Sequence, residues 1–267
     1  MIFELGVIIC LAIVSFLSIK KRNKSALIFQ TIAVILLSVF IIITWVNLQR
    51  APFKTIGETR IWYSFFLMIL NGIVFWRWKN ALFLIFINTM ACIFIVVNIC
   101  KPELQSHVLI PVLQSVWFIP HVAIYMFAYA AIGCAFVSGF FELFTFVNYN
   151  KRCKEFIKSK KTEYYNANFC EPLIVIGTVA LTFGICFGAI WAKKAWGQYW
   201  SWDIKENAAL ITWIIFFLYI HLQKFTTINR KYLLIILMIG FLSLNFTWYG
   251  VNFLPAAQKS PHTFYNK

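Results

Sequence analysis

The sequence predicts an all-α fold, a polytopic bundle of about eight transmembrane helices with both termini outside the cytoplasm. Of its 267 residues, 61% are hydrophobic and only 12% are charged, whereas a soluble domain has about a quarter charged residues. Apolar runs near the length of a membrane-spanning helix, about 20 residues, recur along the whole chain. They lack the alternation of a transmembrane barrel, so their backbone amides must be satisfied within helices.

The predicted spans begin with residues 2–19, which we interpret as a retained helix. No basic segment precedes this run and no small-residue cleavage site follows it, unlike a signal peptide. Seven further apolar runs follow, at 26–48, 61–76, 81–99, 117–147, 173–192, 207–222 and 232–250. The run 117–147 is longer than a bilayer needs, and we expect it to project beyond the membrane. We divide the chain into an N-terminal four-span region, 1–105, and a second membrane region, 106–267.

Basic residues predict the orientation of these spans. One alternating set of loops holds 15 Lys and Arg residues, and the other set holds 9. Cytoplasmic loops are enriched in Lys and Arg, so the first set is expected inside and both termini outside. The loop 148–172 contributes most, with six basic residues. The same bias explains the net charge of +15, so we expect membrane lipid around the chain and no nucleic acid as a partner.

The cysteines exclude several kinds of site. Seven are scattered along the chain and none forms a CxxC pair, so neither structural zinc nor a disulfide framework is expected. No CxxCH motif is present either, which excludes covalently attached c-type haem on this chain itself.

A GxxxG pattern lies inside the sixth predicted span, from Gly184 to Gly188. Such a pattern allows two helices to approach closely. We therefore expect it to serve helix packing rather than ligand binding.

The segment WGQYWSWDIKE, which begins at Trp196, is the most informative part of the sequence. It combines Trp196, Trp200 and Trp202 with a tyrosine, two carboxylates and a lysine, between two apolar spans. Aromatic surface of this density beside charge suits a large flat ligand. An ordinary interfacial belt of Trp and Tyr is the competing interpretation. Asp203 and Glu206 also have the spacing of a capping box at the start of the next helix.

Two of the four histidines share the predicted outer side with this segment. His121 lies near the outer end of its span, and His262 lies in the C-terminal tail. His221 follows Asp203 by 18 residues, about 27 Å along a helix, so it is expected near the cytoplasmic end of its span. A lone histidine is more often interfacial than a ligand, but an ionisable residue inside a span is a functional hypothesis. His107 precedes its span, and we leave it outside the site.

The order of residues in WGQYWSWDIKE closely resembles the tryptophan-rich WWD signature of haem-handling membrane proteins. Within these proteins it is most similar to the CcsA (ResC) branch of the System II cytochrome c maturation machinery. Three other segments resemble that family: 113–117 ahead of His121, 218–221 ending at His221, and 249–254 ahead of His262. The chain departs from the usual pattern at Ile204, where proline is common, and around His262. Region 106–267 thus resembles a haem-handling WWD (cytochrome c assembly) domain.

The resemblance implies that the chain binds haem b. His121 and His262 would be the axial ligands of an outer haem, and His221 would bind an inner haem on the export path. The residues implied against the outer ring are Trp196, Trp200 and Trp202, and Asp203 belongs to the same cofactor-binding set. From their charge and position, Lys193, Lys194 and Lys205 are candidates to pair with the haem propionates.

The activity implied by the resemblance is export or channelling of haem b and its covalent attachment to the CxxCH motif of apocytochrome c. The chain would be a subunit of a holocytochrome c synthase. A second imidazole is needed at the depth of His221, and a CcsB/ResB-type membrane subunit is the implied source. Reduced CxxCH thiols imply thiol-reducing proteins as further partners. The expected location is the bacterial inner (cytoplasmic) membrane, in preference to a thylakoid membrane, with the signature facing the periplasm or exterior.

Two alternatives stay open from the sequence. A CcmC-like haem carrier would share the tryptophan-rich motif but would have no synthase activity. A basic multi-span structural protein would use its tryptophans only as an interfacial belt. Haem absorbance of the purified chain separates this structural role from the haem-binding ones, and formation of covalent cytochrome c separates a synthase from a carrier.

Overall fold

The computed structural model describes residues 2–101, 115–149, 170–225 and 227–255. Within these ranges the chain is helical and contains no strand. The long helices are α1 (Ile2–Ile19), α2 (Asn23–Leu48), α3 (Ile56–Trp78), α4 (Ala81–Cys100), α5 (Phe118–Tyr149), α7 (Cys170–Trp196), α8 (Ile204–Phe225) and α9 (Arg230–Trp248), and a short 3-10 helix, η2 (Gly250–Phe253), follows α9. Each of these eight long helices is long and apolar enough to cross a membrane. The predicted all-α integral membrane fold with eight spans is confirmed.

Local capping explains why a helix can begin before its predicted apolar run. α3 begins at Ile56 rather than residue 61, because Thr55 and Glu58 form a capping box. The Glu58 N–H donates to the Thr55 hydroxyl oxygen at 3.1 Å, and the Thr55 N–H donates to the Glu58 carboxylate at 3.3 Å. These bonds satisfy amides that would otherwise lack partners in the first turn.

The outer location of both termini and the division at residue 105 stay predictions.

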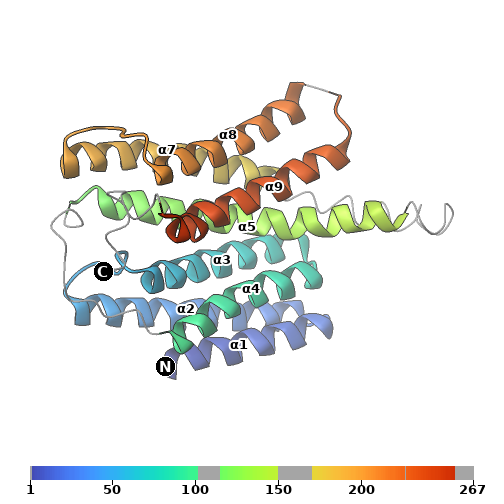
Figure 1. Ribbon diagram of the computed structural model, residues 1–267. Coiled ribbons are helices and arrows are strands. Elements are labelled where there is room, and N and C mark those ends of the chain that lie inside the picture. The colour runs from blue at the N-terminus through green and yellow to red at the C-terminus, as the bar shows by residue number, and fades with distance from the viewer. Residues whose placement is uncertain (1, 102–114, 150–169, 226, 256–267) are drawn as a thin grey trace.

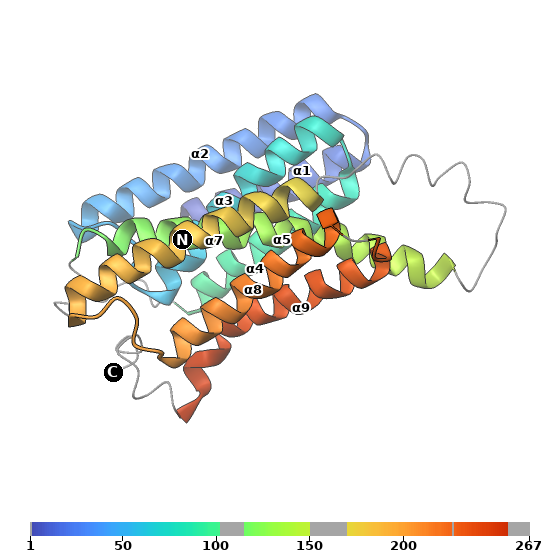
Figure 2. The ribbon, with the colours of Figure 1, turned by 90° about the horizontal axis from the view of Figure 1, so that it is seen from above.

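α5 is the central helix of the bundle. It packs against α3 and α4 on one side and against α7 and α9 on the other (Figure 1). In an 18-residue apolar stretch of α5, 72% of the residues are buried, compared with 28% in the corresponding stretch of α1. With 32 residues, α5 is about 48 Å long, and its last turns extend beyond the neighbouring helices (Figure 2). The run 117–147 thus extends past its neighbours, and its projection beyond the membrane stays a prediction.

Polar side chains that are buried in the first half and partly buried in the second join helices within each half of the bundle. In the first half, the Asn88 amide of α4 donates to Gln30 of α2 at 3.0 Å. In the second half, Arg230 at the start of α9 binds Glu142 of α5 with two hydrogen bonds of 2.9 and 3.0 Å. The same guanidinium donates to Glu171 of α7 at 2.8 Å. Such bonds hold membrane helices together where lipid offers polar groups no alternative partner.

Candidate functional site

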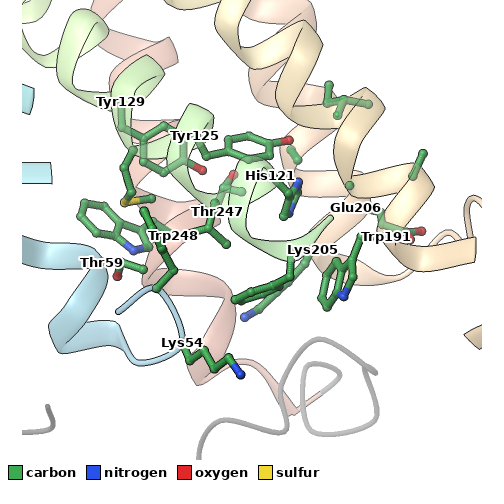
Figure 3. A pocket seen from close by; sticks show the side chains of 18 of the residues that line it. Lys54, Thr59, His121, Tyr125, Tyr129, Trp191, Lys205, Glu206, Thr247 and Trp248 are labelled. Carbon is green, nitrogen blue, oxygen red and sulfur yellow. The ribbon is translucent and has the colours of Figure 1, made fainter. Parts of the chain in front are cut away.

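A pocket opens at the end of the bundle where α5 and α8 begin and α7 and α9 end (Figure 3). The segment before α3 and the loop before α8 complete its wall. About 1220 Å³ of empty space lies in the pocket and its open mouth, and part of this space is open to solvent. Its wall is mainly apolar and aromatic and includes Phe53, Phe118, Val122, Tyr125, Met126, Tyr129, Ile185, Trp191, Tyr199, Trp200 and Trp248. A concave, largely apolar space with a few polar groups is the usual form of a cofactor or small-molecule site.

His121 lies on this wall, in the first turn of α5. Its Nδ1 atom is 2.8 Å from the backbone carbonyl oxygen of Gly184 in α7. A carbonyl oxygen only accepts hydrogen bonds, so Nδ1 carries a proton, and in the neutral imidazole Nε2 then carries the lone pair. Histidines that bind metals are commonly fixed in this way by a bond from the other ring nitrogen. The predicted ligand His121 therefore lies in the pocket in a tautomer that suits iron ligation.

Aromatic rings fix the orientation of the His121 imidazole. Trp191 stacks on it, with ring centroids 5.6 Å apart and an interplanar angle of 28°. Tyr125, one turn further along α5, meets the imidazole edge-on at 4.9 Å. Trp191 is only 3% exposed, so it forms a fixed wall behind the histidine. Figure 3 shows the three side chains together at the pocket.

The GxxxG pattern explains how α5 and α7 come close enough to place His121. A Cβ atom on Gly188 would lie 2.6 Å from Cε1 of His121, and a Cβ on Gly184 would lie 2.9 Å from Cε2 of Tyr125. Both distances are too short for real Cβ contacts. The two glycines thus leave the space that these rings fill. The pattern serves helix packing, as the sequence predicted, and this packing positions the candidate ligand.

The three tryptophans of the signature take different positions. Trp200 lines the pocket, and its indole Nε1 is buried with no hydrogen-bond partner among the described residues. Trp196 packs edge-on against Trp191, with centroids 5.0 Å apart. Trp202 is 69% exposed and meets Trp200 edge-on at 5.9 Å. Trp200 therefore contacts the cavity, whereas Trp196 supports its wall and Trp202 lies at the surface.

Asp203 is the N-cap of α8. Its Oδ1 accepts hydrogen bonds from the N–H groups of Lys205 and Glu206, both at 2.8 Å, and Glu206 accepts from the Asp203 N–H at 3.3 Å. The predicted capping box is therefore confirmed. Glu206 also accepts from the Ser201 N–H at 2.7 Å. Asp203 and Glu206 together fix the loop that carries Trp200 into the pocket.

The three lysines proposed for the propionates differ in position. Lys205 lines the pocket. The ammonium group of Lys193 lies over the Tyr199 ring, 5.4 Å from its centroid, and that of Lys194 lies 5.7 Å from the centroid of Trp117. Lys205 is therefore the best placed of the three to meet an anionic group in the cavity.

His221 lies apart from the pocket, on an exposed face of α8. Its ring contacts Phe225 with centroids 4.8 Å apart. Along the helix it is 12 residues from Ala209, a residue of the pocket wall, or about 18 Å. His262 and His107 lie outside the described residues. The pairing of His121 with His262 therefore stays a prediction.

Comparison with known proteins gives the same family as the tryptophan-rich signature implied. A sequence model of the family described as "Cytochrome C assembly protein" matches residues 2–257. The chain belongs to this family. Cytochrome c biogenesis protein CcsA of Cuscuta exaltata is 32% identical over 235 residues, which cover 78% of this chain and 75% of that protein. The CcsA of Solanum lycopersicum is 31% identical over 242 residues, with 79% and 76% covered. This is a CcsA-type protein, as the resemblance implied.

A solved structure has a similar fold. The chain matches Cytochrome c Heme Lyase CcmF with a TM-score of 0.67 and 14% sequence identity. The match covers 92% of this chain but 46% of CcmF, so the CcsA-type chain corresponds to about half of that protein. At this identity, the similarity shows a shared fold alone.

Some pocket residues of the CcsA-type chain were not predicted from sequence. Trp191 follows Gly184 and Gly188 on the same side of a helix, and that spacing is the signal that would have found it. Lys54 comes from the distant N-terminal half, and no local pattern indicates it. Partial burial and the nearby Arg50 lower the pKa of Lys54 from its ordinary value, and the Glu58 carboxylate opposes them.

The pocket fits a haem group in its chemistry. Nε2 of His121 offers a ligand for iron, and the aromatic walls suit the faces of a porphyrin. Lys54 and Lys205 line the wall as candidate partners for carboxylates. Trp200 also lines the pocket, and its buried indole N–H has no hydrogen-bond partner among the described residues.

Proposed function

We propose that this CcsA-type protein carries haem b across the membrane and presents it in the pocket for attachment to apocytochrome c. The observation that carries this proposal is the His121 imidazole, which is held by the Gly184 carbonyl and stacked on Trp191. His262 is the proposed second axial ligand. Membership of the cytochrome c assembly family, and relatives that are named cytochrome c biogenesis proteins, support this role.

The residues of the pocket would act mainly by positioning haem and excluding water. His121 binds the iron from one face, and Trp200 and Trp191 limit how the ring can tilt. Lys205 and Lys54 hold the propionates by charge, which sets the rotation of the ring in its plane. Fixing the ring in this way places its vinyl groups where an incoming peptide can reach them, and positioning of two reactants is a large catalytic effect.

The proposed attachment is addition of each CxxCH thiol across a haem vinyl group. A carbon–sulfur bond forms, the vinyl double bond becomes a single bond, and the thiol proton ends on the neighbouring vinyl carbon. No electron is gained or lost overall, so the thiols must arrive reduced. Thiol-reducing proteins are therefore proposed partners. The histidine of CxxCH then replaces one axial histidine, which releases the product.

His221 is the proposed inner ligand on the path from the cytoplasm. Its exposed position on α8 leaves room for a second chain beside it. A CcsB/ResB-type membrane subunit is the proposed source of the second imidazole. If the chain purified alone shows a fully bis-histidine inner haem, this part of the proposal is wrong.

The decisive experiment is the visible spectrum of the purified full-length chain. We expect a haem signal whose axial ligation changes in His121→Ala and in His262→Ala. His107→Ala serves as the matched control and should leave the spectrum unchanged. If a resolved haem signal is the same in His121→Ala and His262→Ala, the proposed outer site is wrong. If the chain binds no haem, the proposed function is wrong.

Covalent cytochrome c formation separates a synthase from a carrier. We expect it in a maturation-deficient host that expresses the chain with its partner subunit, and its absence would favour a CcmC-like carrier. The proposed location is the bacterial inner membrane, with the pocket facing the exterior. The plant relatives support a thylakoid membrane as the alternative.

A further inference from the structure

A hydrogen-bonded pair, Trp213 of α8 and Thr182 of α7, lies between His221 and the pocket. The indole N–H of Trp213 donates to the Thr182 hydroxyl oxygen at 2.8 Å. Along α8, Trp213 is four residues from Ala209 of the pocket wall and eight from His221, or about 6 and 12 Å. Along α7, Thr182 is three residues from Ile185, which also lines the pocket. The pair therefore joins α7 to α8 directly below the cavity, on the side that leads to His221.

The Thr182 hydroxyl is oriented to accept this bond. It donates its own proton to the Thr178 carbonyl within α7, at 2.9 Å. Its oxygen lone pairs are therefore available to the Trp213 N–H. A tryptophan N–H in an apolar environment usually finds such a partner, and hydroxyl groups commonly join membrane helices in this way.

Aromatic surface continues from this pair to His221. Residues 209, 213, 217 and 221 are spaced four apart, so they follow one another along one stripe of α8. Phe217 stacks on Trp213, with centroids 5.1 Å apart and an interplanar angle of 19°. Phe217 is 52% exposed, so its ring is accessible to a molecule on this face. The stripe connects the exposed histidine with the pocket through rings that suit a flat porphyrin.

We infer that Trp213 and Thr182 form a gate on the route of haem from His221 to the pocket. This inference rests on the proposed function, because it requires haem at both sites. When the bond is formed, the indole of Trp213 spans from α8 to α7. It then separates the part of the stripe at Phe217 and His221 from the cavity. When the bond breaks, the indole can turn about its side-chain torsions and open that passage. Thr182 is exposed, whereas Trp213 is half-buried and packs against the hydrophobic core, so opening costs part of that packing as well as the hydrogen bond.

Two conservative variants test the gate, and each removes one partner of the hydrogen bond. Thr182→Val keeps the side-chain shape and removes the acceptor, and Trp213→Phe keeps a ring and removes the donor. The full-length chain is purified soon after haem synthesis is induced in the cells, before the two sites equilibrate, so that the ratio reports the rate of transfer. The spectra of His121→Ala and His221→Ala assign the outer and inner haem. We expect either variant to raise the ratio of outer to inner haem by up to about fivefold, the factor for one hydrogen bond of about 1 kcal/mol. The double variant should add little, because both changes break the same bond.

Controls distinguish a gate from a role in helix packing alone. They also distinguish failure of the gate from failure of the proposed function. Thr89→Val in α4 is matched, since its hydroxyl makes the same kind of bond, to the Ile85 carbonyl at 2.8 Å, and it should leave the ratio unchanged. A rise in the occupancy of the outer site that persists in a His221→Ala background overturns the gate. An unchanged ratio in Thr182→Val and Trp213→Phe, while both sites still hold haem, also overturns it. Equal loss from both sites with lower thermal stability shows a packing role only and also overturns it. Absence of haem from the unsubstituted chain overturns the proposed function itself.

Discussion

Gly188→Ala tests whether helix packing sets the geometry of His121. The added Cβ would lie 2.6 Å from Cε1 and 2.7 Å from Nδ1 of His121, whereas ordinary contacts begin at 3.4 Å. The imidazole must therefore shift by about 0.8 Å, the difference between 3.4 and 2.6 Å. Trp191 is stacked on one face of the ring and is 3% exposed, so it cannot yield. The shift would break the bond of 2.8 Å from Nδ1 to the Gly184 carbonyl.

The expected result of Gly188→Ala is a loss of haem affinity that exceeds the loss of stability. Overpacking of this kind costs about 1–3 kcal/mol of unfolding free energy. Loss of the partner that orients a metal-ligating histidine typically costs about 10–100-fold in metal affinity. We therefore expect haem affinity to fall at least about tenfold. The measurement is a haem titration followed by visible absorbance, together with thermal unfolding of the haem-free chain in detergent.

Gly139→Ala is the matched control for this prediction. Its added Cβ would lie 2.5 Å from Cδ2 of Leu237, so it overpacks the contact between α5 and α9 far from His121. It should lower thermal stability to a similar extent and leave haem affinity unchanged. If Gly188→Ala binds haem with unchanged affinity and an unchanged spectrum, then the close approach of α5 and α7 does not set the ligand geometry and the reasoning is refuted.

Three further predictions concern the supports of the pocket and the bundle. Asp203→Ala removes the N-cap of α8 and should cost about 1 kcal/mol of stability; thermal unfolding measures this, and equal stability of Asp203→Ala and Asp203→Asn would contradict it. Arg230→Met removes the group that joins α9 to α5 and α7 and should cost about 2–3 kcal/mol, whereas Lys231→Met at the neighbouring, exposed position should be neutral in the same assay. Lys205→Met should weaken haem binding in a titration more than Lys193→Met does, because Lys205 lines the pocket; equal effects would exclude a propionate contact.

Several features were predictable because they depend on neighbouring residues along the chain. The eight spans follow from runs of apolar residues, since transfer of such a run into lipid depends on its own composition. The start of α8 follows from Asp203 and Glu206, whose side chains reach only their own first turn. The packing role of Gly184 and Gly188 follows from their spacing. The signature itself also identified the family, because the order of its residues is local information.

The surroundings of the individual signature residues were not predictable in this way. The resemblance implied that Trp196, Trp200 and Trp202 lie against one haem ring, and this stays a prediction. In the structure Trp200 lines the cavity and Trp202 is 69% exposed. Adjacent residues in a loop point in different directions, and their directions depend on the backbone. The Asn207 side-chain amide donates to the Trp202 carbonyl oxygen at 2.9 Å, and Trp202 has a left-handed φ of 59°. This backbone leaves the Trp202 ring at the surface, in edge-on contact with the Trp200 ring.

By itself, the sequence determined a membrane protein of eight helices, its family, and His121 as a candidate ligand. The tertiary structure alone decided what surrounds that ligand. The Gly184 carbonyl and the Trp191 ring belong to α7, and Lys54 precedes α3, so all three are far from His121 in the sequence. Burial of an apolar run depends on the residues of that run, but the meeting of α5 with α7 depends on whether the shapes of two distant surfaces fit. Two glycines opposite His121 and Tyr125 provide that fit, and only the folded chain brings them together.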